Sequence, residues 1–262
     1  CIRDRCVPDV RGGVLRVVSV EPVSVPGLGA RCISVESELE TFVCAGHVVT
    51  HNSTTLASML RRIQLERPQK IITLEKPVEF LYPFDGRALV VQREIGQDAR
   101  SFSSALDSAM RQAPDIILVG EVRNEEEVDA LLRASETGHL TLSTMHTKSA
   151  ASTINRIKSL YSGSDQLRVL ASLSDVARGF ANQVLVKDKQ GGRFAVREVL
   201  SVDEEVSDLI VSGDVAGIRR YQIEHEKTME HGLADAVLRG KCTLDEARRV
   251  SQYRGLFDSL IN

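Results

Sequence analysis

DIILVGE, residues 115–121, places four consecutive apolar side chains between two acidic residues. A continuous apolar run of this length is typical of a strand buried on both faces of a parallel sheet. An acid at the end of such a strand has the general form of a Walker B site, where the carboxylate faces Mg²⁺ and the attacking water. On this segment alone, a buried strand that ends in a capping Glu is the alternative.

Strand and helix patterns alternate on both sides of this run. Short apolar runs predict strands in KIITLEKP (70–77) and HLTLSTMHT (139–147). Helical spacing of apolar residues predicts helices in STTLASMLRRIQ (53–64), FSSALDSAMRQ (102–112), EEEVDALLRASETG (125–138) and SAASTINRIKSL (149–160). Such alternation predicts an α/β fold with a mainly parallel sheet.

The two ends of the chain have other patterns. Residues 1–52 are rich in Val, Gly, Pro and Ser, and their short alternating runs predict several short strands. After about residue 200 one helical pattern follows another, which predicts a small α-helical bundle. We therefore expect three regions, at 1–52, 53–200 and 201–262.

Composition narrows the class of protein. The chain is 42% hydrophobic and 26% charged, which is ordinary for a soluble globular protein. The formal net charge of −3 argues against non-specific nucleic-acid binding. No apolar run approaches the roughly 20 residues that span a bilayer, so we expect no transmembrane segment. Five cysteines without a CxxC pair favour a reduced, cytoplasmic protein, and the initial Cys1 suggests a fragment.

Two further segments carry candidate catalytic groups. Glu75 and Glu79 bracket Pro77 after one predicted strand, and a carboxylate near a γ-phosphate can orient or deprotonate water. His139 and His146 flank another predicted strand. Taken singly, the carboxylates are equally compatible with a solvated turn, and the histidines with core or edge residues.

Taken together and in order, these segments resemble the secretion ATPase superfamily that drives type II secretion and type IV pili, most nearly the pilus retraction ATPases. The resemblance covers Ser53 to about Val250. It rests on five segments. STTLASML resembles the residues that follow the Walker A lysine in the family, and VQREIGQDARSFSSALDSAMRQ resembles its linking segment. The other three resemble its named boxes, the Asp box in ITLEKPVEF, the Walker B box in QAPDIILVGEVRN and the His box in ASETGHLTLSTMHTKSA.

The resemblance implies a RecA-like core, a homo-hexameric ring and hydrolysis of ATP with Mg²⁺. It also implies a partner in the pilus or secretion platform of the inner membrane, with the enzyme cytoplasmic and peripheral to that membrane. By position it makes Glu79 the general base, Glu121 the Walker B glutamate at Mg²⁺, and Arg123 the arginine that follows it. His139 and His146 become the His-box pair, Ser53 the P-loop hydroxyl on Mg²⁺, and Thr54 its neighbour at the phosphates.

Two positions depart from the family pattern. The Asp box usually reads Glu-Asp-Pro, whereas Lys76 stands here in place of Asp, which reverses a charge beside the expected metal. The helical motif after the core of retraction motors keeps only its apolar skeleton in residues 204–210. A conjugative or type IVb secretion motor therefore stays open beside a retraction motor.

The front of the phosphate-binding loop is missing. A P-loop needs glycines and a lysine before its Ser or Thr, but the sequence before Ser53 reads HVVTHN. His-Asn before Ser resembles the C-terminal splice junction of an intein, and ARCISVES with LETFVCAGHVVTHN resembles the last two intein blocks. The class without an N-terminal nucleophile is the most similar.

That resemblance implies a splicing role for five residues: Cys32 as the internal nucleophile, Thr50 and His51 as residues that assist cleavage, Asn52 as the residue that cyclises, and Ser53 as the acceptor nucleophile. Cys32 as a small buried hydrophobe is the alternative. The expected protein is an ATPase motor interrupted by an intein, inactive in ATP hydrolysis before splicing. A P-loop-defective, non-hydrolysing ring protein and a split intein that acts in trans are the other two hypotheses.

Overall fold

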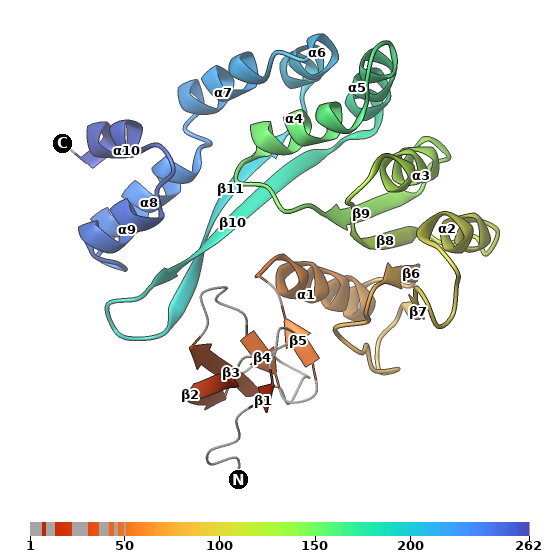
Figure 1. Ribbon diagram of the computed structural model, residues 1–262, viewed down its shortest axis with the longest axis horizontal. Helices are drawn as coiled ribbons and strands as arrows, with labels where there is room; N and C mark the ends of the chain where they lie inside the picture. The colour runs from red at the N-terminus through yellow and green to blue at the C-terminus, as the bar shows by residue number, and fades with distance from the viewer. Residues whose placement is uncertain are drawn as a thin grey trace.

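The computed structural model describes backbone and side chains of residues 55–261 and the backbone alone of residues 7–8, 14–22, 31–36, 42–44, 47–49 and 51–54. Its centre is a parallel sheet in the order β7-β6-β8-β9 (Figure 1). The strands are β6 (Lys70–Glu75), β7 (Leu89–Glu94), β8 (Ile116–Glu121) and β9 (Leu140–Thr144). The predicted α/β fold with a parallel sheet is confirmed, and β7 is a strand that the sequence patterns did not reveal.

Strand β8 lies between β6 and β9, as its continuous apolar run predicts. Its four apolar residues 116–119 are all buried, and Ile117 is fully enclosed. Parallel pairing to β6 and β9 satisfies the backbone of β8 on both sides. Because no position of this run faces water, the run is continuous rather than alternating.

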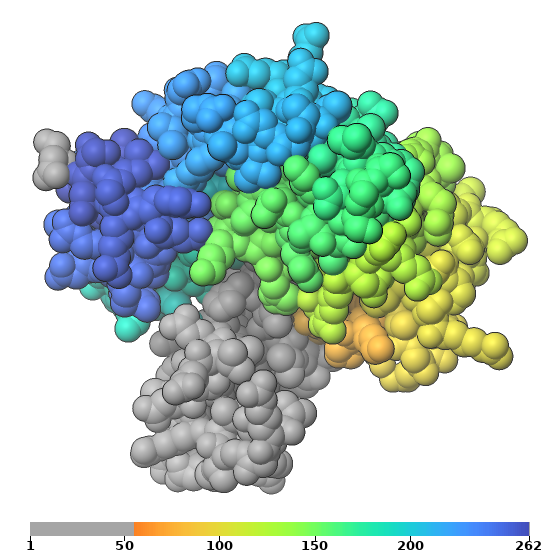
Figure 2. Space-filling model, turned by 45° about the horizontal axis from the view of Figure 1, so that its top comes forward, coloured from red at the N-terminus to blue at the C-terminus, as the bar shows by residue number. Residues whose placement is uncertain are grey.

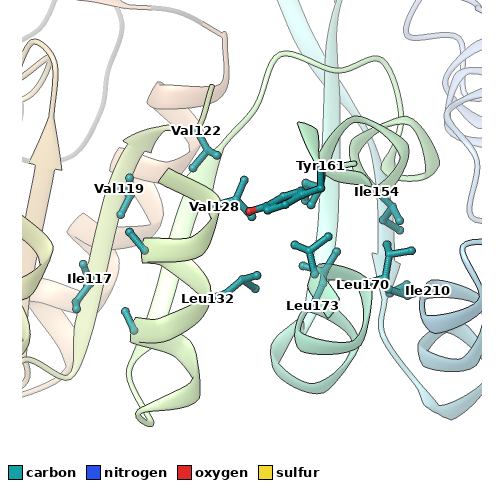
Figure 3. Packing of buried hydrophobic residues seen from close by; sticks show 14 of the residues in the cluster. Ile117, Val119, Val122, Val128, Leu132, Ile154, Tyr161, Leu170, Leu173 and Ile210 are labelled. Carbon is teal, nitrogen blue, oxygen red and sulfur yellow. The ribbon is translucent and has the colours of Figure 1, made fainter. Parts of the chain in front are cut away.

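Three helices pack on the sheet: α1 (His51–Glu66), α2 (Phe102–Met110) and α3 (Glu125–Glu136). Two more, α4 (Ala150–Leu160) and α5 (Asp165–Val176), pack beyond α3 and extend its core. Figure 3 shows Val128 and Leu132 of α3 between the β8 side chains and the α4–α5 layer. Serine and asparagine side chains cap α2, α3 and α4, as their sequences suggest.

The C-terminal part differs from the predicted single bundle. A long antiparallel hairpin, β10 (Gly179–Lys187) and β11 (Arg193–Ser201), precedes the helices and runs through the molecule as a diagonal ribbon (Figure 1). The helices are α6 (Glu204–Ser212), α7 (Val215–Glu224), α8 (Met229–Leu238), α9 (Leu244–Val250) and α10 (Arg254–Ile261).

These five helices join two separate cores. Residues of α6 and α7 bury apolar side chains in the core shared with α3, α4 and α5, among them Val206 and Ile218. Residues of α8, α9 and α10 pack instead on the hairpin, in a core that includes Val196, Leu233 and Phe257. The bundle is divided because the hairpin supplies a second apolar face that the sequence reading did not assign.

The N-terminal strands form a sheet of their own. They are β1 (Val7–Pro8), β2 (Val14–Pro22), β3 (Arg31–Glu36), β4 (Phe42–Cys44) and β5 (His47–Val49), paired in sequence order and antiparallel. The expected short strands are therefore confirmed. Within the described part of the chain, no helix is long and apolar enough to cross a membrane.

Candidate active site at the carboxyl edge of the sheet

A cavity of about 470 Å³ opens where strands β6, β8 and β9 end. In a parallel sheet the carboxyl ends of neighbouring strands meet at one edge, where α/β proteins bind their ligands. Its lining comes from α1, from the segment after β6, from the start of α2, and from the ends of β8 and β9. Four of the residues predicted for catalysis line it: Glu79, Glu121, Arg123 and His146.

Glu121 is the centre of the polar contacts in this cavity. Its carboxylate, with 24% of the side chain exposed, pairs with the Arg123 guanidinium through one oxygen and with His146 Nε2 at 3.4 Å through the other. The hydrogen bond to Glu121, together with the charge of that carboxylate, raises the pKa of Arg123. Both partners are mostly exposed, so a cation or a ligand can replace them at Glu121 with little loss of stability.

The backbone around Glu121 fixes its position. The pairing register of β8 with β9 shifts between Val119 and Glu121, and the Thr144 hydroxyl donates to the Gly120 carbonyl at 2.7 Å. A Cβ on Gly120 would lie 3.4 Å from the Cα of Glu75. The carboxyl ends of β6 and β8 are therefore packed against each other at this point, with room for at most a small side chain at position 120.

Glu75 adds a second, more deeply placed carboxylate. It is 8% exposed and accepts hydrogen bonds from the Thr73 hydroxyl at 2.6 Å and from Gln92 Nε2 at 3.3 Å. Burial, and secondarily the charge of Glu75, raises the pKa of Tyr82, which lines the same cavity. Tyr82 is therefore a neutral hydroxyl at any physiological pH.

The first turn of α3 forms another wall of the cavity. The Arg123 amide donates to Glu127 Oε2 at 2.7 Å, and the Glu127 amide donates to Asn124 Oδ1 at 3.0 Å. These bonds hold the segment after Glu121 in place at the start of the helix. Arg123 is thus anchored through its backbone while its guanidinium reaches back to Glu121.

The structure places His139 away from the cavity. It precedes the first residue of β9, whereas His146 follows the last, so the two lie at opposite edges of the sheet. A five-residue strand separates them by roughly 17 Å. His139 Nδ1 contacts the Ala134 carbonyl at 3.1 Å and the Thr137 hydroxyl at 3.0 Å, which ties it to the end of α3. The structure brings only His146 to Glu121.

The predicted P-loop and splicing residues lie outside the fully described range. The side chains of Cys32, His51, Asn52, Ser53 and Thr54, and all of Thr50, are outside the described residues. The backbone of His51–Thr54 belongs to α1, so the helix begins two residues earlier than the pattern STTLASML predicts. Leu56 and Ala57 of α1 line the cavity, so α1 borders it close to Ser53.

Other residues that line the cavity were not among the predicted site residues. They include Tyr82, Arg100, Asn124 and Glu127. Glu75 was a candidate from the sequence, because it closes the strand pattern KIITLE at the same edge as Glu121, but the family resemblance gave it no role. The sequence offered no such signal for Tyr82 and Arg100, which reach the cavity from connecting segments.

The cavity suits a nucleotide held together with a divalent ion. Its volume is within the range of small-molecule sites, and Glu75, Glu79 and Glu121 offer carboxylate oxygens. Among the described residues, no three His, Cys, Asp or Glu side chains form a metal site by themselves. Mg²⁺ bound through one or two carboxylates plus phosphates requires no such all-protein site. The donors present therefore fit a Mg²⁺–nucleotide complex.

Comparison with known proteins agrees with this geometry. The family described as "Type II/IV secretion system protein" matches residues 35–249. The chain belongs to this family. The matched range begins before Ser53, so it includes part of the segment predicted to be an intein fragment, and that interpretation stays a prediction.

Three relatives illustrate the range of the family. A "Twitching motility protein" of Neisseria gonorrhoeae is 34% identical over 241 residues, 90% of this chain and 64% of that protein. "Type IV pilus retractation ATPase PilT" of Pseudomonas aeruginosa is 41% identical over 164 residues, 63% of this chain and 47% of the relative. "Type II secretion system protein E" of Aeromonas hydrophila is 29% identical over 238 residues, 76% of this chain and 46% of the relative. The chain thus spans about half to two thirds of the length of these relatives.

Solved structures show the same fold. "Crystal Structure of the Pilus Retraction Motor PilT and Bound ADP" aligns with a TM-score of 0.72 and 29% identity, covering 89% of this chain and 77% of that one. "X-ray structure of the Legionella pneumophila ATPase DotB" aligns with a TM-score of 0.71 and 29% identity, covering 76% and 56%. The chain therefore has the fold of these two proteins over the parts that align.

Proposed function

We propose that this chain is part of an ATP-hydrolysing motor subunit of a type IV pilus, as in twitching motility, or of a type II or type IV secretion system. Its expected form is a homo-hexameric ring in the cytoplasm, peripheral to the inner membrane and acting on the platform protein there. The observation that carries the proposal is the cavity in which Glu79, Glu121 and His146 converge. Family membership supports it, as does the ADP bound to the aligned pilus retraction motor.

In this proposal each residue of the cavity has one task. Bound Mg²⁺–ATP supplies the reactive phosphoanhydride. Glu79, one of whose oxygens is out of contact with solvent, orients a water molecule and accepts its proton. Glu121 and the Ser53 hydroxyl would hold the ion, and Thr54 would lie beside the phosphates. Arg123 and His146, which contact Glu121 in this structure, would be available to contact the anionic ligand.

We further propose that residues 1–52 are the C-terminal part of an intein that interrupts the P-loop. The Cys32 thiolate attacks the carbonyl of the upstream junction, forms a thioester with the upstream segment and releases the amine of the first intein residue. The Ser53 hydroxyl takes over that acyl group as an ester, which frees the Cys32 thiol. The Asn52 side-chain nitrogen then attacks its own carbonyl and breaks the Asn52–Ser53 peptide bond, while His51, with Thr50 beside it, protonates the leaving amine. The freed Ser53 amine then takes the acyl group from its own hydroxyl, which forms the new peptide bond and restores the hydroxyl that the motor would use at Mg²⁺.

An alternative is a P-loop-defective paralogue that serves as a structural or regulatory ring subunit. The observation that favours it is the absence of a Gly-Lys pair before Ser53, where the sequence reads HVVTHN. A ring protein of this kind would keep the fold and the cavity without turnover.

One experiment separates the two. The full reading frame, expressed and run on a gel, is expected to yield a ligated product shorter than the translated chain, and Asn52→Ala is expected to abolish it. The ligated product should hydrolyse Mg²⁺–ATP, and the 262-residue chain alone should not. A single unspliced band without turnover would favour the alternative, and turnover by the 262-residue chain would contradict the requirement for splicing.

A further inference from the structure

The segment that follows His146 is held by hydrogen bonds from the C-terminal half of the chain. Asn182 of β10 donates from Nδ2 to the Thr147 carbonyl at 2.8 Å. Gln252, between α9 and α10, donates from Nε2 to the Lys148 carbonyl at 2.6 Å. The Ala150 amide donates to Glu198 of β11 at 2.7 Å. Three contacts therefore fall within four residues of His146.

The third of these hydrogen bonds, from the Ala150 amide, ends on a deeply buried side chain, that of Glu198. Glu198 is 1% exposed, and its second oxygen accepts from the Met229 amide, the first of α8, at 3.2 Å. One carboxylate therefore bonds the first amide of α4 and the first amide of α8. A buried polar group that loses a hydrogen-bond partner carries a desolvation penalty, so neither helix start can move away from Glu198 without a cost.

The second of these hydrogen bonds comes from Gln252, whose neighbour Tyr253 is held by another buried carboxylate. Glu230 of α8 is fully buried and accepts from the Tyr253 amide at 3.1 Å. Arg219 of α7 pairs with Glu230 at 3.2 Å and stacks on the Tyr253 ring at 3.7 Å. Gln252 therefore precedes a residue that is fixed to the core of α7 and α8, although its own side chain is exposed. In Figure 2 the green surface near residue 150 lies against the blue C-terminal helices.

We propose that Gln252 is a positioning residue that couples helices α8–α10 to the loop carrying His146. His146 contacts Glu121 in the cavity, and Gln252 holds the backbone two residues beyond it. Displacement of α8–α10 then moves His146 relative to Glu121. By reciprocity, a ligand that displaces His146 from Glu121 shifts those helices. The second half of this inference rests on the proposed ATPase function; the mechanical link itself does not.

The link is tested first without nucleotide, on the 262-residue chain. Amide hydrogen exchange of residues 145–150 is compared in the wild type, in Gln252→Ala and in Gln252→Glu, which keeps the length but has no donor. We expect exchange in this segment to be about fivefold faster in both variants, the effect of one lost hydrogen bond, with Tm unchanged. Gln252→Lys, which restores a donor, should return the exchange rate of this segment towards the wild-type value. Gln190→Ala, at an exposed glutamine of the hairpin turn, is the control. Unchanged exchange at 145–150 in both donor-free variants overturns the proposal, whatever the ATPase result.

The functional half is tested on the spliced, full-length enzyme. Gln252→Ala should lower kcat for ATP about fivefold with KM unchanged, because the residue positions His146 and does not contact the nucleotide. Gln252→Lys should recover kcat. Faster exchange with an unchanged kcat would refute the functional coupling. Absence of turnover in the wild-type enzyme would instead refute the proposed ATPase function and leave the exchange result standing.

Discussion

The two edges of the parallel sheet both carry polar and charged side chains, but they use them in different ways. At the amino edge, Asp115 accepts from the Lys70 amide at 2.7 Å, and His139 bonds the end of α3. Both side chains hydrogen-bond to backbone groups at the amino edge. At the carboxyl edge, Glu121 and His146 contact each other, and both line the cavity. Polar groups at the amino edge, which bond to backbone, therefore mainly support the fold, whereas polar groups that face the cavity are available to a ligand.

The largest expected effect is at the carboxyl edge. In the enzyme proposed to form by splicing, Glu121→Gln should lower turnover at least about a hundredfold while nucleotide binding persists, because one group placed at the developing charge is worth about 10²–10³-fold. Steady-state hydrolysis and binding of a fluorescent nucleotide measure the two. Glu136→Gln, an exposed glutamate of α3, is the matched control. Loss of hydrolysis and binding together would mean that Glu121 has been assigned the wrong role.

The two histidines compare the edges directly. His146→Ala should reduce kcat about tenfold, less than the 10²–10⁴-fold effect of a general acid or base, because His146 contacts Glu121 and does not itself transfer the proton, and Tm should change little. His139→Ala should lower the free energy of unfolding by about 1 kcal/mol through loss of its bonds to α3, and should reduce kcat less than His146→Ala does. Hydrolysis and urea unfolding of both variants decide the matter. An equal loss of kcat would contradict the separation of the two edges.

A third variant tests the amino edge alone. Asp115→Ala removes the acceptor of the Lys70 amide and should destabilise the fold by about 1 kcal/mol. Asp115→Asn keeps a carbonyl acceptor and should recover most of this. Thermal unfolding measures both. If Asp115→Ala abolishes hydrolysis while Tm stays constant, the amino edge has a catalytic role.

The smallest effect concerns pH. The hydrogen bond from Arg61 lowers the pKa of Asp85, which ties the segment before β7 to α1. A carboxyl whose folded pKa lies below its unfolded value, about 3.9, stabilises the fold above that pH. This contribution is lost as pH falls through the folded pKa. Asp85→Asn should therefore flatten the acid side of the stability curve below about pH 4, and an unchanged slope there would argue against the pair.

Local patterns were sufficient for much of the fold. The apolar runs of β6, β8 and β9 and the helical spacing of α2–α4 gave elements of the right type, because burial on both strand faces or on one helix face leaves a clear period. The β10–β11 hairpin was missed although Gly191 and Gly192, both at positive φ, join its alternating runs. Its partner face, the helices α8–α10, lies far along the chain, and the division of the C-terminal helices into two cores depends on that long-range packing.

The site was predicted only in part for a similar reason. Strand ends marked Glu121 and His146, and in a parallel sheet those ends share an edge. His139 was grouped with His146 because both flank one strand, but it lies at the opposite end of β9, away from the cavity, so its His-box role stays a prediction. Tyr82 and Arg100 reach the cavity from connecting segments whose paths depend on tertiary contacts such as Arg61–Asp85.

The buried carboxylate of Glu198 also determines where the chain can be shortened. A protein cut after β11 would keep Glu198 but lose the Met229 amide, one of its two backbone donors, together with the apolar cover over Val196. The remaining half would contain a partly satisfied charge next to the first turn of α4. The C-terminal helices are therefore not a detachable module, and insertions or fusions will be tolerated better at the Gly191–Gly192 turn than at the boundary near residue 201.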